Sequence, residues 1–220
     1  MKNEELIIKS VSICGFRSFT EPCRIEFSSG INIITDPLEK GAADLLKVIG
    51  WVLKTDESLE DLLENAAEVL FCGNDLRPAA NEAYVIVRKG YAENDEHNIE
   101  LKRTINSNDE YHYFLNEKEV SCSEWENTDE RITHLKLISL FGDFEIPAAL
   151  TGIRLKGSGA MDGDFHIYAP HLFGSGIQDI VACNNRKLIS FLKPKRIIGI
   201  AREEPGISKI YNIQFEEEFD

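Results

Sequence analysis

The stretch that decides the fold covers residues 31–53 and reads INIITDPLEKGAADLLKVIGWVL. It opens with an apolar, β-branched run from Ile31 to Thr35, which predicts a buried strand. A turn is expected at Asp36-Pro37, because proline fixes its own φ and favours turn positions. Beyond Gly41, apolar residues recur at helical spacing at positions 45, 46, 49, 52 and 53. The stretch is therefore expected to form a strand, a tight loop and an amphipathic helix.

This layout is the setting of a Walker A loop, which binds phosphate through the pattern G-x-x-x-x-G-K-[ST]. In that pattern backbone N–H groups face the phosphate, the lysine contacts the β- and γ-phosphates, and the hydroxyl holds Mg²⁺. Here Asp36 stands at the first glycine position, Ala42 at the lysine position and Ala43 at the hydroxyl position, while Gly41 is kept. We interpret the stretch as the frame of a phosphate loop without its chemical contacts. Lys40 stands two residues too early to replace the missing lysine.

Composition places the chain among ordinary soluble globular proteins, with 220 residues, 43% apolar and 28% charged. The net charge of −14 disfavours strong binding to nucleic acid, because that binding depends on cations that neutralise phosphates. The acidic segments at 56–64 and 216–220 instead favour a solvated surface or a basic protein partner. The five cysteines and five histidines show no metal-binding spacing, so we expect reduced thiols and no metal site.

No apolar run is long enough for a membrane span, and the N-terminus lacks the apolar segment of a signal peptide, so a cytoplasmic location is expected. Alternating apolar patterns predict an antiparallel pair of strands over 6–14 and 23–27. Further strands, helices and turns are expected along the chain. Strands are predicted at 83–89, 99–104, 111–115, 119–122, 135–141, 165–168, 177–181, 197–201 and 210–215, helices at 42–54, 57–70 and 186–192, and polar turns or linkers at 90–98, 106–110 and 123–133.

Several quoted segments resemble the ATPase head of the bacterial SMC (structural maintenance of chromosomes) family. Residues 8–19, IKSVSICGFRSF, resemble the family strand that ends in G-F-K-S-F, and residues 30–37, GINIITDP, resemble its approach to the phosphate loop. The resemblance continues in the same order through residues 51–53 (WVL), 69–75 (VLFCGND), 77–81 (RPAAN), 83–85 (AYV) and 113–120 (YFLNEKEV). Residues 198–209, IGIAREEPGISK, resemble the last strands of the head.

The resemblance implies a mixed α/β fold, an ABC-ATPase-like head with an antiparallel N-terminal sheet and a mixed central sheet. It divides the head into an N-terminal lobe at 1–125, with a degenerate phosphate loop, and a shortened C-terminal lobe at 126–220, packed as one compact domain. Family members carry a long coiled coil and a hinge between these lobes. Only residues 121–135 are available here, and they show no heptads.

The resemblance also places the family's other ATPase motifs, each without its reactive residues. The signature motif S-G-G-E falls at Gly142, Asp143, Phe144 and Glu145. The two acidic positions of the Walker B strand fall at Ala169 and Pro170. The switch histidine position falls at Asn184, and the arginine-finger position falls at Leu62. We therefore expect no catalytic residue and no cofactor.

The resulting hypothesis is a catalytically inactive SMC-like head, a pseudo-ATPase that acts as a protein-interaction module in chromosome organisation, segregation or DNA repair. Its expected partner is a second copy, an SMC-type head or an SMC-associated subunit. Two alternatives stay open at this point. One is an atypical nucleotide-binding protein or ATPase that uses Lys40, and the other is a weak DNA-binding module whose basic contact is Arg17.

Overall fold

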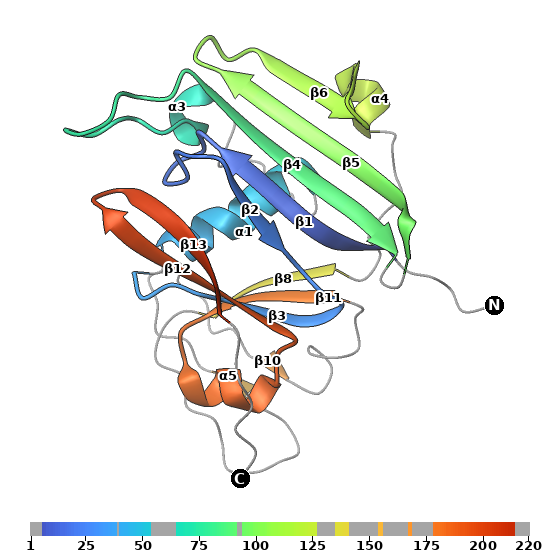
Figure 1. The fold of residues 1–220 in the computed structure, drawn as a ribbon, viewed down its shortest axis with the longest axis vertical. Coiled ribbons are helices and arrows are strands. Elements are labelled where there is room, and N and C mark those ends of the chain that lie inside the picture. The colour runs from blue at the N-terminus through green and yellow to red at the C-terminus, as the bar shows by residue number, and fades with distance from the viewer. Residues whose placement is uncertain are drawn as a thin grey trace.

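A computed structural model describes residues 6–38, 40–53, 65–91, 94–126, 135–140, 154–155, 167–168 and 178–213. Two sheets lie one above the other, with helix α1 (Lys40–Leu53) between them and helix α5 (Arg186–Leu192) on the far side of the lower sheet (Figure 1). This layered arrangement confirms the predicted fold class, an antiparallel N-terminal sheet joined to a mixed central sheet.

The six-stranded sheet is antiparallel throughout and follows the order β2-β1-β4-β5-β6-β7. Its strands are β1 (Leu6–Cys14), β2 (Cys23–Glu26), β4 (Glu82–Tyr91), β5 (Asn94–Asn106), β6 (Tyr111–Leu115) and β7 (Lys118–Val120). The turn predicted at 90–98 is much shorter, because β4 continues to pair with β1 as far as Tyr91. Backbone pairing across the sheet thus extends the strands into a polar sequence.

The five-stranded sheet is mixed and follows the order β13-β12-β3-β11-β8. Its strands are β3 (Gly30–Thr35), β8 (Leu135–Leu140), β11 (Gln178–Cys183), β12 (Arg196–Glu204) and β13 (Ile207–Ile213). Strand β3 pairs in parallel with both β11 and β12, and only the β12–β13 pair is antiparallel within this sheet. A strand from the N-terminal part of the chain therefore lies at the centre of a sheet built otherwise from the C-terminal part.

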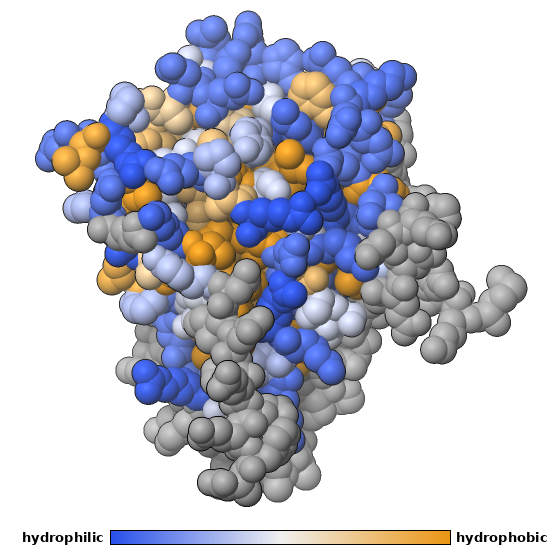
Figure 2. Space-filling model, viewed as in Figure 1, coloured by the Kyte–Doolittle hydropathy of each residue, from blue (hydrophilic) through white to orange (hydrophobic). Residues whose placement is uncertain are grey.

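The core fills the space between the sheets around α1. The helix buries Leu45, Val48 and Ile49 completely, as expected from its apolar periodicity. Hydrophilic side chains cover most of the six-stranded sheet in Figure 2, while apolar ones gather in the middle of the molecule between the sheets. In the described part of the chain, no helix is long and apolar enough to cross a membrane.

Two short helices differ from what the sequence predicts: one lies where a linker is expected, and the other is shorter than the predicted helix. Helix α4 (Cys122–Glu126) begins the segment expected to be a linker, and its Trp125 is buried against Tyr113 with ring centroids 5.2 Å apart. Helix α3 (Ala66–Val69) is the described part of the helix predicted at 57–70. The remaining strands, β9 (Arg154–Leu155) and β10 (Ile167–Tyr168), pair with each other in a separate two-stranded sheet.

Candidate functional site

The loop between β3 and α1 is organised around the carboxylate of Asp36. Its Oδ2 accepts hydrogen bonds from the backbone N–H groups of Gly41, at 2.7 Å, and Ala42, at 3.2 Å. Its Oδ1 accepts one from the N–H of Leu38 at 2.9 Å. These donors belong to the loop and to the first turn of α1, which are the backbone groups that a phosphate loop presents to its ligand. Residue Asp36 is 2% exposed, so its carboxylate is a buried acceptor for the loop's own N–H groups.

Glycine at position 41 leaves room for the close contact of Asp36 with the helix. A Cβ atom added to Gly41 would lie 2.7 Å from Ile200 Cγ2, 2.7 Å from Ser208 Oγ and 3.1 Å from Asp36 Oδ2. The next residue, Ala42, is fully buried, whereas Pro37 and Lys40 are exposed and Ala43 is half-buried. The structure thus brings the residues predicted from the loop motif together, with methyl groups at the lysine and hydroxyl positions.

Asn184, at the predicted switch position, holds the base of the same loop. Its Oδ1 accepts hydrogen bonds from Thr35 Oγ1 at 3.1 Å and from the Asp36 N–H at 2.9 Å, and its Nδ2 donates to the Asp36 carbonyl at 2.6 Å. Asn184 follows β11 directly, and β11 lies beside β3 in the sheet. The carboxyl ends of two neighbouring parallel strands are therefore tied together through one side-chain amide.

A second carboxylate, Asp44, lies on α1 one turn beyond the loop. It forms an ion pair with Arg17 at 3.3 Å and accepts a hydrogen bond from Ser18 Oγ at 3.2 Å. The Arg17 guanidinium also donates to the Glu68 carbonyl at 2.8 Å. Burial raises the pKa of Asp44 above its usual value, and this effect outweighs the opposing attraction to Arg17.

The pairing of Arg17 with Asp44 is a feature that the sequence does not predict. The backbone of Arg17 is in the left-handed region with φ of 44°, which an arginine adopts only when its surroundings hold it there. Its N–H donates to the Val69 carbonyl at 2.8 Å, and its side chain is held as described above. The sequence held one signal for this pairing: Asp44 falls on the buried side of the predicted helix, and a buried charge requires a partner.

The remaining predicted motif positions lie outside the described residues. They are Gly142, Asp143, Phe144 and Glu145 of the signature motif, Ala169 and Pro170 of the Walker B strand, and Leu62. The strand predicted at 165–168 is described at Ile167–Tyr168, where it pairs with β9. Among the residues that the structure describes, no group of three or more acidic, histidine or cysteine side chains could hold a metal ion.

No family model matches the chain, but curated proteins do. It is 28% identical over 129 residues to the chromosome partition protein Smc of Halothermothrix orenii, a match that covers 56% of this chain and 11% of that protein. It is 29% identical over 93 residues to the Smc protein of Bacillus subtilis, covering 42% of this chain and 8% of that protein. The chain thus matches about a tenth of the length of these relatives.

Solved structures of SMC heads share the fold over nearly the whole chain. The crystal structure of an Smc head bound to the C-winged helix domain of ScpA matches with a TM-score of 0.70 at 15% identity, covering 96% of this chain and 98% of that chain. The SMC head domain from Thermotoga maritima matches with a TM-score of 0.61 at 15% identity, covering 94% and 99%. Together, these matches show that the chain is similar in sequence to part of bacterial Smc proteins and has the fold of an SMC head.

Proposed function

We propose that this chain is an SMC-family head and a pseudo-ATPase, which binds other proteins in chromosome organisation, segregation or DNA repair without hydrolysing ATP. The observation that carries the proposal is the position of the Asp36 carboxylate. A nucleotide phosphate would compete with it for the N–H groups of Gly41 and Ala42, and it would bring more negative charge beside a buried carboxylate.

The side chains around the loop support the same conclusion. Phosphoryl transfer depends on positioning and on charge stabilisation by a lysine, by Mg²⁺ and by the groups that hold it. Ala42 and Ala43 supply neither an ammonium group nor a hydroxyl, so the residues present do not fit a nucleotide polyphosphate with its Mg²⁺. Loss of a single stabilising contact of this kind costs about 10² to 10³ in rate, and here more than one is missing.

Binding to another protein is the function that remains for a head that lacks the groups needed for ATP hydrolysis. One similar head was crystallised with the C-winged helix domain of ScpA, so heads of this fold bind other proteins. We propose that this chain binds a second copy of itself, an SMC-type head or an SMC-associated subunit, in the cytoplasm or on the nucleoid. Arg17, the basic residue of the DNA-binding alternative, is paired with Asp44 and is therefore a poor contact for DNA.

Calorimetric titration of the full chain with Mg-ATP tests the nucleotide part of the proposal. We expect no binding by the wild-type protein at ligand concentrations of up to about 1 mM, which is the upper range of typical substrate KM values. Binding in the wild type would contradict the proposal. If Lys40→Gln then abolished it, the result would establish the atypical nucleotide-binding alternative, in which the exposed Lys40 contacts phosphate. A head of a bacterial Smc relative with an intact loop serves as the positive control.

Light scattering and affinity capture from the native cell test the partner part. We expect a specific complex with an SMC protein or SMC-associated subunit, or a stable self-dimer. A protein that stays strictly monomeric and captures no specific partner would contradict the interaction role, whatever the outcome with ATP. The two experiments therefore separate lost catalysis from protein binding.

A further inference from the structure

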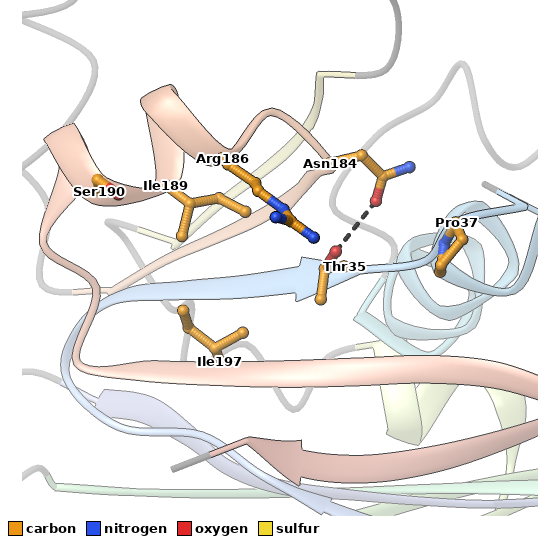
Figure 3. Close-up of a pocket in the computed structure, with 7 residues that line it drawn as sticks. All are labelled: Thr35, Pro37, Asn184, Arg186, Ile189, Ser190 and Ile197. Carbon is orange, nitrogen blue, oxygen red and sulfur yellow. Dashed lines mark hydrogen bonds between the residues drawn. The ribbon is translucent and has the colours of Figure 1, made fainter. Parts of the chain in front are cut away.

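A cavity of about 660 Å³ lies between α5 and the five-stranded sheet (Figure 3). Helix α5 covers the face of this sheet opposite α1 (Figure 1). This volume is within the range of about 300–1,000 Å³ typical of small-molecule sites. Thr35 and Asn184 line it where β3 and β11 end, and Arg186, Ile189 and Ser190 line it from α5. Pro37 and Ile197 complete its described wall.

The position of the cavity in the topology favours a ligand site. Strands β3 and β11 are parallel neighbours, but the chain leaves β3 into α1 on one face of the sheet and leaves β11 into α5 on the other face (Figure 1). Open α/β sheets bind ligands in the crevice that forms at the carboxyl ends of such a strand pair. In this chain the hydrogen bonds of Asn184 to Thr35 and Asp36 close the crevice toward the loop, which leaves the part beneath α5.

The polar groups of the cavity favour an anion. The Arg186 guanidinium extends from α5 into the cavity toward Thr35 (Figure 3). Across the part of the chain that the structure describes, no ion pair or hydrogen bond engages this guanidinium, and no acidic side chain lines the cavity. The Ser190 hydroxyl lies on the same helix and can donate a second hydrogen bond. An exposed guanidinium in a chain with a net charge of −14 is thus available to a ligand.

The apolar groups of the cavity limit what that anion can be. Ile189, Ile197 and Pro37 present an apolar wall, which suits a hydrocarbon or aromatic body and not a fully hydrated ion. One guanidinium pairs in a bidentate manner with one carboxylate or one phosphate group. The described lining holds no second cation, so a polyphosphate would lack a partner for most of its charge.

We propose that this cavity binds a small organic anion, with one carboxylate or phosphate group on Arg186 and an apolar body against Ile189 and Ile197. The site adjoins the loop at Asp36 through Thr35, Pro37 and Asn184, but its proposed ligand contacts lie on α5 and β12, so it does not depend on the proposed loss of ATP hydrolysis. Carboxylates and phosphate monoesters share the chemistry that Arg186 recognises, and comparison of two probes distinguishes them.

Calorimetry and amide chemical-shift mapping with four probes test the site. Benzoate and phenyl phosphate carry both parts of the ligand, inorganic phosphate carries only the anion, and benzyl alcohol carries only the apolar body. We expect benzoate or phenyl phosphate to bind at least about tenfold more tightly than either partial probe, with the tighter one identifying the acid group. Shifted amides should include Thr35 and Ile189.

Charge variants provide the matched control. Arg186→Gln should weaken binding about tenfold to a hundredfold, since it removes a charge-assisted hydrogen-bond pair. Arg186→Lys should give an intermediate loss, and Arg24→Gln, in the other sheet, should leave binding unchanged. Circular dichroism confirms that each variant is folded. The proposal is overturned if no probe binds, if Arg186→Gln binds like wild type, if inorganic phosphate binds as tightly as phenyl phosphate, or if the shifts centre on Gly41 and Ala42.

Discussion

The Asp36 carboxylate accepts three backbone hydrogen bonds at the start of α1, so removing it leaves buried donors without acceptors. We expect Asp36→Ala to lower the free energy of unfolding by about 2–3 kcal/mol, from the loss of a helix cap and of hydrogen bonds to a charged group. Asp75→Ala, which removes an exposed aspartate, should change it by less than about 0.5 kcal/mol. Urea unfolding measures both, and equal stability of the two variants would contradict this role of Asp36.

The loop around Asp36 could be predicted from the sequence only in part. The motif comparison predicts that Asp36, Ala42 and Ala43 replace phosphate-binding residues, because that argument depends on residue type alone. It does not predict that the Asp36 carboxylate binds the loop's own N–H groups. That contact depends on a tight loop, which is fixed by the packing of Gly41 against Ile200 and Ser208, and these lie more than 150 positions away in sequence.

Asp44 makes stability depend on pH in a defined direction. Burial raises its pKa in the folded protein above the ordinary value of 3.8, so the folded state holds this proton more tightly than the unfolded state does. The resulting stabilisation is present below the unfolded pKa and is lost as pH rises through the folded pKa. In the Asp44→Asn variant this side chain cannot ionise, so the variant does not lose that stabilisation as pH rises.

Urea unfolding of wild type and Asp44→Asn from about pH 3.5 to about pH 6.5 measures that effect. We expect the free energy of unfolding of the wild type, relative to the variant, to fall as pH rises over this interval. Other titrating groups are shared by both proteins and cancel in the difference. A constant difference at all pH values, or one that grows with pH, would show that the pKa of Asp44 is not raised.

At the scale of elements, Arg77 fastens the loop at 71–81 to the β12–β13 hairpin and to the loop before β2. Its guanidinium forms two hydrogen bonds with Glu204, each of 3.1 Å, and one with Glu21 at 2.5 Å. Asn74 adds a bond from its Nδ2 to the Pro205 carbonyl. Exposed ion pairs contribute little to global stability, so the effect of this cluster should be local.

We therefore expect Arg77→Ala to leave the melting temperature nearly unchanged while hydrogen exchange becomes faster in two segments, residues 73–80 and 203–208. Exchange of the α1 amides should stay at the wild-type rate, because the helix is buried between the sheets. Arg88→Ala, which breaks the comparable Arg88–Glu100 ion pair within the six-stranded sheet, is the matched control. Faster exchange in both segments of that control, or in neither segment of Arg77→Ala, would argue against the fastening role.

Helices and strands lie where the sequence predicts them if the local pattern and the tertiary packing favour the same structure. Strand β3 and helices α1 and α5 are close to their expected ranges, because apolar periodicity alone indicates their buried faces. Helix α4 was expected to be a linker, although Ser121 and Glu124 have the spacing of a capping box, and the Ser121 hydroxyl indeed accepts a bond from the Glu124 N–H. The aromatic contact of Trp125 with Tyr113 stabilises this short helix. The polar composition of the segment gives no indication of that contact.

The N-terminal and C-terminal parts of the sequence are joined within one sheet. Strand β3 belongs to the N-terminal part and pairs on both sides with C-terminal strands. The proposed boundary between residues 125 and 126 therefore divides the sequence into lobes that share a sheet. One buried side-chain amide connects the two sheets directly. The Gln178 side chain, on β11, accepts from the Ile8 N–H at 2.8 Å and donates to the carbonyls of Ile8 at 2.8 Å and Ser28 at 3.0 Å.

Replacing Gln178 with methionine keeps the volume of the side chain but removes its bonds to Ile8 in the other sheet and to Ser28 in the loop between β2 and β3. Gln178 is fully buried, so the backbone groups of Ile8 on β1 would lose an acceptor and a donor in a place that water does not reach. We expect Gln178→Met to lower the free energy of unfolding by about 3 kcal/mol. Ile180→Val, in the same strand, keeps the bonds and should cost about 1 kcal/mol through the lost methyl group.

Urea unfolding monitored separately by fluorescence and by circular dichroism distinguishes a weakened connection from general destabilisation. Both Trp51 and Trp125 lie on the side of the six-stranded sheet, so fluorescence reports on that part, while circular dichroism reports on both sheets. If the amide couples the sheets, the two transitions should coincide in wild type and in Ile180→Val and should separate in Gln178→Met. If Gln178→Met costs no more than Ile180→Val and its transitions coincide, apolar packing around α1 joins the two sheets without help from the buried amide.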